Sequence, residues 1–297
     1  MQRIVLLAPY GLLGAELARS LAGLGQLFTL SRADVDFADP TATMIRVAAL
    51  SPTLIVNAAG FTAVDLAETA ATQAYLLNAK LPAALAQLAQ HRGCWLCHFS
   101  SDYVYSGAGT RPWSEHDIAA PLSVYGASKL AGDEAILHSG AKAVILRTSW
   151  LYGHTGRHFF STMLQRFQQG QSVSVVSDQI GAPTPARLVA QYTAQVVRAV
   201  LSGKADASGV YHLACRGETS WFGFAQTILA WAQQHGIGLD SSLTAINSDR
   251  YRQLFPQAAA RPFNSRLQLD KFEQTFAVTL PDWSSEFAAV SAQYRVD

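Results

Sequence analysis

Short apolar segments alternate with amphipathic helical segments through the first half of the chain, and this alternation constrains the fold more than any other feature. Strands are predicted at Arg3–Ala8, Gln26–Leu30, Thr53–Ala58, Cys94–Ser100 and Ala143–Thr148. Helices are predicted between them at Leu12–Leu24, Ala42–Leu50, Ala67–Gln90 (with a break near Pro82) and Ser123–Leu137. Continuously apolar strands that alternate with helices form a parallel sheet covered on both faces. The predicted fold class is therefore α/β, a doubly wound Rossmann-like sheet that binds ligands at the carboxyl ends of its strands.

The alternation weakens beyond Trp150. Helices are expected at Phe159–Gln169, Leu188–Leu201 and Trp221–His235, joined by segments rich in Gly, Pro and Ser. We interpret this half as a smaller C-terminal lobe that packs over the sheet edge and forms one wall of a cleft. The predicted domains are residues 1–150, which carry the sheet, and residues 151–297, mainly the smaller lobe, with later segments free to return to the sheet.

The overall charge excludes several classes of partner. The formal net charge is +1 and charged residues make up 14% of the chain, so neither a nucleic acid nor an anionic membrane is an expected partner. No apolar run approaches the roughly 20 residues needed to span a bilayer. The apolar run after Arg3 stops at Pro9 and is too short for a signal peptide. We therefore expect a cytoplasmic protein.

The three cysteines do not predict a disulfide framework or a metal site. Cys94 and Cys97 form a C-x-x-C pattern inside a predicted strand. Because side chains alternate along a strand, the two thiols are expected on opposite faces of the sheet. They therefore cannot share a metal ion.

A glycine-containing loop follows the first strand and opens the first helix, in the sequence Ala8-Pro9-Tyr10-Gly11-Leu12-Leu13-Gly14. Gly11 would let the backbone approach a pyrophosphate at the helix N-terminus, and Gly14 would let the helix pack closely on the strand. Ala8 replaces the first glycine of the usual G-x-x-G-x-x-G pattern, and we expect it to tighten or reshape the turn. A simple strand-to-helix turn is the alternative, but the position favours a dinucleotide site at Gly11, Leu12 and Leu13.

The end of the second strand indicates which dinucleotide would bind. Ser31 and Arg32 stand where many NAD-binding folds have an acidic residue that holds the ribose 2′-hydroxyl. A guanidinium can instead pair with a 2′-phosphate. The sequence therefore favours NADPH, with NADH possible. A solvent-facing Arg32 with no such role is the alternative.

Tyr125 and Lys129 form a Y-x-x-x-K pattern on a predicted helix, which places both side chains on one face. We expect the ammonium to lower the pKa of the phenol, so that tyrosine can act as a general acid or base. The pattern arises easily by chance, but here it follows a strand that ends in Ser100-Ser101-Asp102. The Ser101 hydroxyl can hydrogen-bond a reacting carbonyl oxygen at that strand end, so the joint occurrence predicts a catalytic site.

With these motifs in place, the chain resembles the extended short-chain dehydrogenases/reductases and, within them, the dTDP-4-dehydrorhamnose reductase family. The likeness runs nearly from end to end. The segments that carry it are Val56-Asn57-Ala58-Ala59, Thr62-Ala63-Val64-Asp65 with Glu68, Ser101-Asp102-Tyr103-Val104, Pro121–Gly126, Lys129–Gly132, Arg147–Trp150, Asp178–Thr184, Arg261–Leu267 and Leu280–Trp283.

The resemblance implies an oxidoreductase in which NADPH delivers hydride to C4 of dTDP-4-dehydro-L-rhamnose while Tyr125 protonates the oxygen. Lys129 would hold the nicotinamide ribose, and Ser101, where the family commonly has Thr, would bind the sugar oxygen with help from Asp102. Trp150 would line the sugar pocket. Further cofactor contacts are implied at Asp36, Phe37, Ala59, Gly60, Phe61 and Thr62. The first domain would bind NADP(H) and the second the nucleotide sugar.

One departure from the family concerns metal. Some members join two subunits through magnesium, but Arg187 occupies the position of one ligand glutamate, so no metal site is expected. His154 and His158 lack a third ligand and are expected to be ordinary loop residues. The chain is expected to be a monomer or a homodimer.

Two alternatives to the reductase stay open. A nucleotide-sugar epimerase or dehydratase shares the fold and the tyrosine–lysine pair, although dehydratases often have an acidic pair directly after the strand-end hydroxyl, where this chain has Asp102 and Tyr103. A non-catalytic NADP-binding regulatory subunit is the second alternative. Retention of Tyr125, Lys129 and Ser101 disfavours it.

Overall fold

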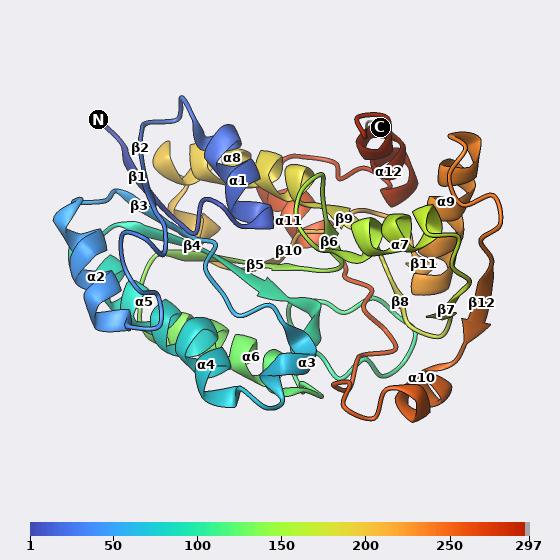
Figure 1. The fold of residues 1–297 in the computed structure, drawn as a ribbon. Helices are drawn as coiled ribbons and strands as arrows, with labels where there is room; N and C mark the ends of the chain where they lie inside the picture. Colours follow the sequence, from blue (N-terminus) through green and yellow to red (C-terminus); the bar gives the residue numbers. More distant parts are fainter. Residues whose placement is uncertain (295–297) are drawn as a thin grey trace.

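Six parallel strands form the centre of the molecule in the computed structural model, which describes residues 1–294 (Figure 1). Their spatial order is β10-β5-β4-β3-β1-β2. The strands span β1 (Arg3–Leu7), β2 (Gln26–Leu30), β3 (Leu54–Asn57), β4 (Trp95–Ser101), β5 (Ala143–Thr148) and β10 (Gly209–His212). In the sheet, β2 lies on one side of β1 and β3 lies on the other, so the topological switch point is between β1 and β3. The predicted doubly wound α/β class is confirmed.

Helices cover both faces of this sheet, because the strands are apolar on both faces. Ile4 and Leu6 point into one core, which α1 (Leu12–Leu21) and α8 (Ala186–Leu201) cover. Val5 and Leu7 point into the other core, beneath α2 (Pro40–Ala49), α5 (Leu81–Arg92) and α6 (Val124–His138). Cys97 lies in the first core and Cys94 in the second, so the two thiols are on opposite faces, as the alternation predicts.

The helix expected at Ala67–Gln90 is not continuous, and that prediction is wrong in detail. The segment contains α3 (Val64–Ala67), α4 (Ala71–Tyr75), a π-helical turn η1 (Leu76–Lys80) and α5. Pro82 does not break the helix but lies in the first turn of α5. Proline has no N–H for the carbonyl four residues earlier, which here is that of Asn78, and the wider π spacing directly before Pro82 accommodates this loss.

The second half of the chain contributes to two cores. Strand β10 completes the sheet beside β5, α8 packs on α1, and α11 (Asp270–Phe276) packs on β10. The other core is aromatic and contains Phe160, Phe167 and Phe224. It is built by α7 (Phe159–Gln168), β7 (Val173–Val176), α9 (Trp221–Gln234), β12 (Leu243–Ile246) and α12 (Trp283–Ser291). These elements lie together on the right in Figure 1.

Shorter elements connect these parts. They are η2 (Asp102–Val104), β6 (Leu151–Tyr152), β8 (Ile180–Gly181), β9 (Thr184–Pro185), η3 (Ala205–Ala207), β11 (Thr219–Ser220) and α10 (Ser248–Leu254). Within residues 1–294, no helix combines the length and the apolar character that crossing a membrane requires.

Candidate active site

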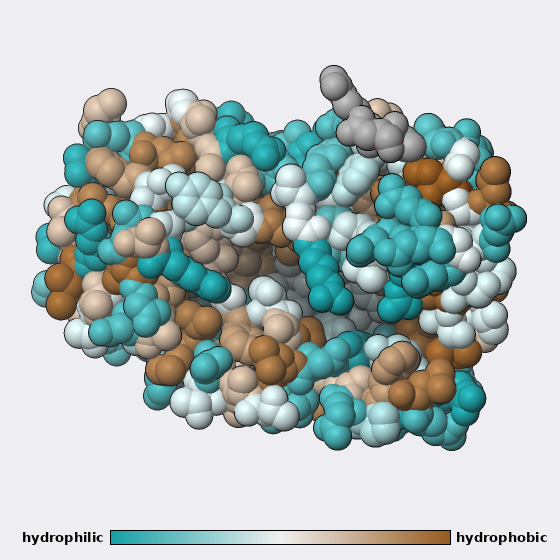
Figure 2. All heavy atoms as spheres, viewed as in Figure 1, coloured by the Kyte–Doolittle hydropathy of each residue, from teal (hydrophilic) through white to brown (hydrophobic). Residues whose placement is uncertain are grey.

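The strands of the sheet end near the middle of the molecule in Figure 1, and Figure 2 shows the surface hollowed there. Strand β4 ends at Ser101, and Tyr125 and Lys129 lie in the first turns of α6. The loops after β1 and β3 reach the same edge, since all these strands are parallel. The geometry therefore gathers the predicted catalytic and cofactor-binding residues at one edge of the sheet.

The glycine-containing loop leaves the N-terminus of α1 without a side-chain cap. Gly11 is the N-cap residue and is exposed, so the first N–H groups of the helix face outward, as an anion site requires. A Cβ on Gly14 would collide with the carbonyl oxygen of Ala8, which shows how closely helix and loop approach. Ala8 has φ 59°, a left-handed conformation that costs an alanine about 1–2 kcal/mol, so this residue strains the turn.

The end of β2 differs from the sequence-based expectation in one respect. No carboxylate was expected there, yet Asp34 turns back and accepts hydrogen bonds from the backbone N–H (2.8 Å) and the hydroxyl (2.7 Å) of Ser31. These two bonds hold the pKa of Asp34 below its usual value. Arg32 is exposed. The site therefore presents the exposed Arg32 next to a serine whose hydroxyl already donates to a carboxylate.

The next two predicted cofactor contacts have separate structural roles. Asp36 is exposed and accepts a hydrogen bond from the N–H of Ala38 (2.9 Å), which forms an Asx turn before α2. The Phe37 side chain is buried in the core beneath α2. Phe37 can therefore meet a cofactor only through its backbone.

The loop after β3 is tied to α6 by a residue that the sequence did not single out. Asn78, fully buried in the π turn, accepts the N–H of Phe61 (2.9 Å) and donates to the Phe61 carbonyl (3.0 Å) and to the Ser128 hydroxyl (3.0 Å). A Cβ on Gly60 would lie 3.1 Å from Asn78 Oδ1 and 3.2 Å from Lys129 Nζ, which are tight contacts, so glycine gives both polar groups room. The one sequence signal was an amide among the apolar residues of a helical segment. Ala59 is buried, and Thr62 is exposed at the loop's far end.

Ser101, Asp102 and Tyr125 meet at the end of β4. The Ser101 hydroxyl donates to Asp102 Oδ1 (3.0 Å) and also lies near enough to Tyr125 to affect the pKa of its phenol. Burial raises the pKa of Asp102 to about 6, and the nearby hydroxyls of Ser265 and Ser101 oppose that rise. Its second oxygen, Oδ2, is buried without a partner within the described residues, so the site holds an unused acceptor.

The expectation that Lys129 lowers the pKa of Tyr125 is wrong for this structure. Burial raises the pKa of Tyr125 to about 12, and the Ser101 hydrogen bond offsets only part of the rise. Lys129 Nζ donates instead to the Phe99 carbonyl on β4 (3.0 Å). Burial also lowers the pKa of Lys129 to about 8. At neutral pH the pair is therefore a neutral phenol and an ammonium, which is the proton-donating form.

Trp150, the predicted wall of the sugar pocket, is held in a tightly fixed position. Its φ is 48°, and its indole stacks on that of Trp221, with ring centroids 3.6 Å apart. A Cβ on Gly181 would lie 2.7 Å from the indole, so glycine is needed on that side. Only 8% of Trp150 is exposed. Trp221 could not be predicted as the partner of Trp150, because nothing in the sequence of its helix links that helix to β5.

The residues considered for metal binding have other partners. Arg187 pairs with Glu286 (3.2 Å). His158 is the N-cap of α7 and forms a capping box with Ser161, and burial lowers its pKa to about 4. Among residues 1–294, no group of three or more His, Cys, Asp or Glu side chains could hold a metal ion.

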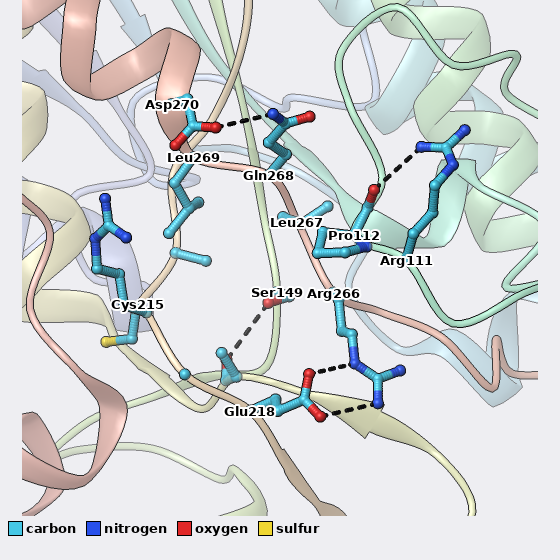
Figure 3. A pocket seen from close by; sticks show the side chains of 14 residues that line it. Arg111, Pro112, Ser149, Cys215, Glu218, Arg266, Leu267, Gln268, Leu269 and Asp270 are labelled. Carbon is cyan, nitrogen blue, oxygen red and sulfur yellow. Dashed lines mark hydrogen bonds and ion pairs between the residues drawn. The ribbon is translucent and has the colours of Figure 1, made fainter.

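A separate cavity of about 550 Å³ lies beyond the edge of the sheet (Figure 3). Its wall contains Ser149, the segments 214–218 and 266–270, and Arg111, but none of the three predicted catalytic residues. Its guanidinium groups already have carboxylate partners, such as Glu218 for Arg266. We therefore do not assign the chemistry to this cavity.

The fold and the site together define an extended-type short-chain dehydrogenase/reductase, since a doubly wound sheet brings an uncapped helix N-terminus to the same edge as Ser101, Tyr125 and Lys129. A family model described as the RmlD substrate binding domain matches residues 1–296. The chain belongs to this family.

Known proteins agree with that assignment. The chain is 43% identical to a dTDP-4-dehydrorhamnose reductase of Escherichia coli strain K12, over 94% of each chain. It is 42% identical to one of Salmonella typhimurium, again over 94% of each. A crystal structure of dTDP-4-dehydrorhamnose reductase from Bacillus anthracis, in complex with NADP, is 28% identical, covers 99% of this chain and 100% of its own, and has a TM-score of 0.89.

Proposed function

We propose that this chain reduces the C4 ketone of dTDP-4-dehydro-L-rhamnose to dTDP-L-rhamnose with NADPH. The observation that carries the proposal is the meeting of Ser101 and Tyr125 at the carboxyl end of β4, one helical turn from Lys129. The family membership supports the same reaction, because relatives that match nearly the full chain are named for it.

The residues present fit an NADP(H) cofactor. The uncapped N-terminus of α1 suits its pyrophosphate, with Gly11, Leu12 and Leu13 supplying backbone N–H groups. Arg32 suits the 2′-phosphate, and the half-buried backbone at Gly60 suits the nicotinamide end. The similar structure from Bacillus anthracis contains NADP. When bound, NADPH supplies the hydride.

Tyr125 is the proton donor to the C4 oxygen in this proposal. Its phenol is neutral at pH 7, since its pKa is about 12, so the proton is available for transfer. Ser101 donates a hydrogen bond to the same oxygen and stabilises the negative charge that develops on it. Lys129, as an ammonium, holds the nicotinamide ribose and so positions the cofactor beside Tyr125. The single proton of the Ser101 hydroxyl is donated to Asp102 in this structure, so the hydroxyl must turn from Asp102 to the C4 oxygen when the sugar binds.

We also propose that the two parts of the chain bind different ligands. Residues 1–150 would bind NADP(H), helped by β10 and α8, which pack on that part. The rest of residues 151–297 would bind the nucleotide sugar, with Trp150 and its partner Trp221 at the boundary.

The test is an NADPH-oxidation assay with dTDP-4-dehydro-L-rhamnose, with the product identified by NMR. We expect stoichiometric consumption of NADPH and the appearance of dTDP-L-rhamnose. An epimerase or dehydratase would convert nucleotide sugars without net NADPH oxidation, and a regulatory subunit would bind NADPH without turnover. Either result would reject the reductase.

The cofactor preference is expected to depend on two opposed side chains. Arg32→Ala should weaken NADPH binding by about 1.5–3 kcal/mol and leave NADH binding nearly unchanged, because the guanidinium pairs only with the 2′-phosphate. Asp34→Ala should shift the preference the other way, since it removes a carboxylate and frees the Ser31 hydroxyl. Fluorescence titration of both cofactors measures the two effects. Equal weakening of NADPH and NADH by Arg32→Ala would show that Arg32 does not read the phosphate.

A further inference from the structure

A buried ionic cluster lies directly behind Lys129, and the reaction proposed above does not use it. Asp133 is one helical turn beyond Lys129 on α6, so Tyr125, Lys129 and Asp133 share one face of the helix. Asp133 is fully buried. Its Oδ2 accepts hydrogen bonds from the Ser100 hydroxyl (2.9 Å) and from Arg147 Nε (2.9 Å).

The cluster continues away from the active site through neutral groups. Arg147, on β5, donates to the Tyr105 hydroxyl (2.8 Å), which also contacts His212 Nε2 (2.7 Å). His212 Nδ1 lies 3.0 Å from the Gln268 carbonyl, in the wall of the cavity in Figure 3. Burial lowers the pKa of His212 to about 3, so this histidine is neutral. Within the described part of the cluster, the charges are thus those of Asp133, Arg147 and Lys129.

Asp133 has a second carboxylate oxygen, Oδ1, that these hydrogen bonds leave unused. Oδ1 is buried and has no hydrogen-bond partner within residues 1–294. Lys129 Nζ has three N–H groups and donates to the Phe99 carbonyl, which is adjacent to Ser100 on β4. One carboxylate thus accepts a hydrogen bond from Arg147 and attracts Lys129 through space.

We propose that Asp133 is a positioning residue that keeps the Lys129 ammonium protonated, and that Arg147 keeps the Asp133 carboxylate ionised. The proposal rests on the role of Lys129 in holding NADPH. An ammonium in this buried place is otherwise unfavourable, because desolvation penalises the charged form. Asp133 opposes that penalty. Burial raises the pKa of Asp133 itself, and the ion pair with Arg147 at 2.9 Å, the hydrogen bond from Ser100 and the charge of Lys129 oppose that rise.

The other groups that face Lys129 do not supply this charge. His98 on β4 is fully buried, and burial holds its pKa well below the usual value, so it is neutral. Tyr125 on α6 is a neutral phenol at the relevant pH. Asn78, in the π turn, carries no charge. Asp102 acts on Tyr125 from the far side of the site. Asp133 is therefore the carboxylate that can stabilise the ammonium.

The experiment is the pH dependence of NADPH affinity, followed by cofactor fluorescence without any sugar substrate. In the wild type, affinity should fall as pH rises past about 8, where Lys129 loses its proton. Asp133→Asn keeps the shape of the side chain and removes its charge, so the midpoint should move down by about one pH unit or more. Arg147→Gln removes the cation that keeps Asp133 ionised, so burial should neutralise the carboxyl group and the midpoint should again move down.

Tyr105→Phe is the matched control. It cuts the same buried network one step further from Lys129 without changing the charge, so it should lower the melting temperature and leave the midpoint unchanged. An unchanged midpoint in Asp133→Asn, or shifts of opposite sign in Asp133→Asn and Arg147→Gln, would overturn the proposal. If Asp133→Asn does not fold, the downward shift in Arg147→Gln still decides the question. A wild type with no midpoint would reject the role of Lys129 itself, whether or not the sugar is reduced.

Discussion

Tyr125→Phe is expected to lower kcat by roughly 10²–10⁴-fold while the protein stays folded and still binds NADPH. The substitution keeps the ring, including its edge-to-face contact with Tyr103 at 5.6 Å, and removes only the hydroxyl. Without that proton, the alkoxide forming at C4 would have to be protonated by water. Steady-state NADPH oxidation and a thermal melt measure the two halves of this expectation.

Two further variants, Lys129→Met and Ser101→Ala, measure the contributions of the other two predicted catalytic residues. Lys129→Met should lower kcat and raise the KM for NADPH together, because the ammonium both binds the cofactor and positions it for hydride transfer. Ser101→Ala should cost least, about tenfold or more, since Tyr125 still contacts the oxygen. A Tyr125→Phe enzyme with nearly normal turnover would mean that the proton comes from elsewhere, with Asp102 as the next candidate because its pKa is about 6.

Gly14→Ala is expected to destabilise the protein by about 3 kcal/mol or more, which is at the upper end of overpacking effects. The added methyl would meet the carbonyl oxygen of Ala8 and the Cα of Pro9, which are backbone atoms that cannot rotate away. Either α1 moves off the sheet or the loop opens, and both changes disturb the site proposed for the pyrophosphate. Thermal melting and NADPH titration should therefore both show a large loss.

Gly11→Ala provides the matched control in the same loop. A Cβ there would lie 3.6 Å from the Ala8 oxygen, an ordinary contact, and Gly11 has φ −73°, which any residue adopts. Stability should hardly change, whereas NADPH affinity should fall because the methyl stands where the cofactor would approach the backbone. If both variants melt at the wild-type temperature, the close packing of α1 on the loop is not what requires glycine at position 14.

The sequence predicted those parts of the fold that depend on local pattern. Continuous apolar strands and the i, i+4 spacing of Tyr125 and Lys129 need no knowledge of distant contacts, and the sheet and the helix follow from them. Contacts between distant segments gave no such signal. The stacking of Trp221 on Trp150 depends on how two halves of the chain fold together. The hydrogen bond that Asp34 accepts from Ser31 depends on the shape of a turn, which the residue types alone do not determine.

Residue patterns were equally insufficient for the candidate active site. Pro82 was correctly recognised as a disturbance in a helical segment, but its effect is felt four residues earlier, where the π turn presents the buried Asn78 to the catalytic helix. The pKa of Tyr125 was predicted in the wrong direction, because the spacing shows that a lysine is near but not that its ammonium points at Phe99. The orientation of a long side chain is decided by packing, which a pattern of residue types does not contain.

The place of β10 at the edge of the sheet has a consequence for how the protein is made. During synthesis β5 leaves the ribosome long before β10 and α8, so the nascent sheet has an unpaired edge and α1 has an uncovered apolar face. Such an edge can pair with another chain. The nascent N-terminal half therefore needs the rest of the chain, or a chaperone, to keep it from associating with other chains until β10 has been synthesised.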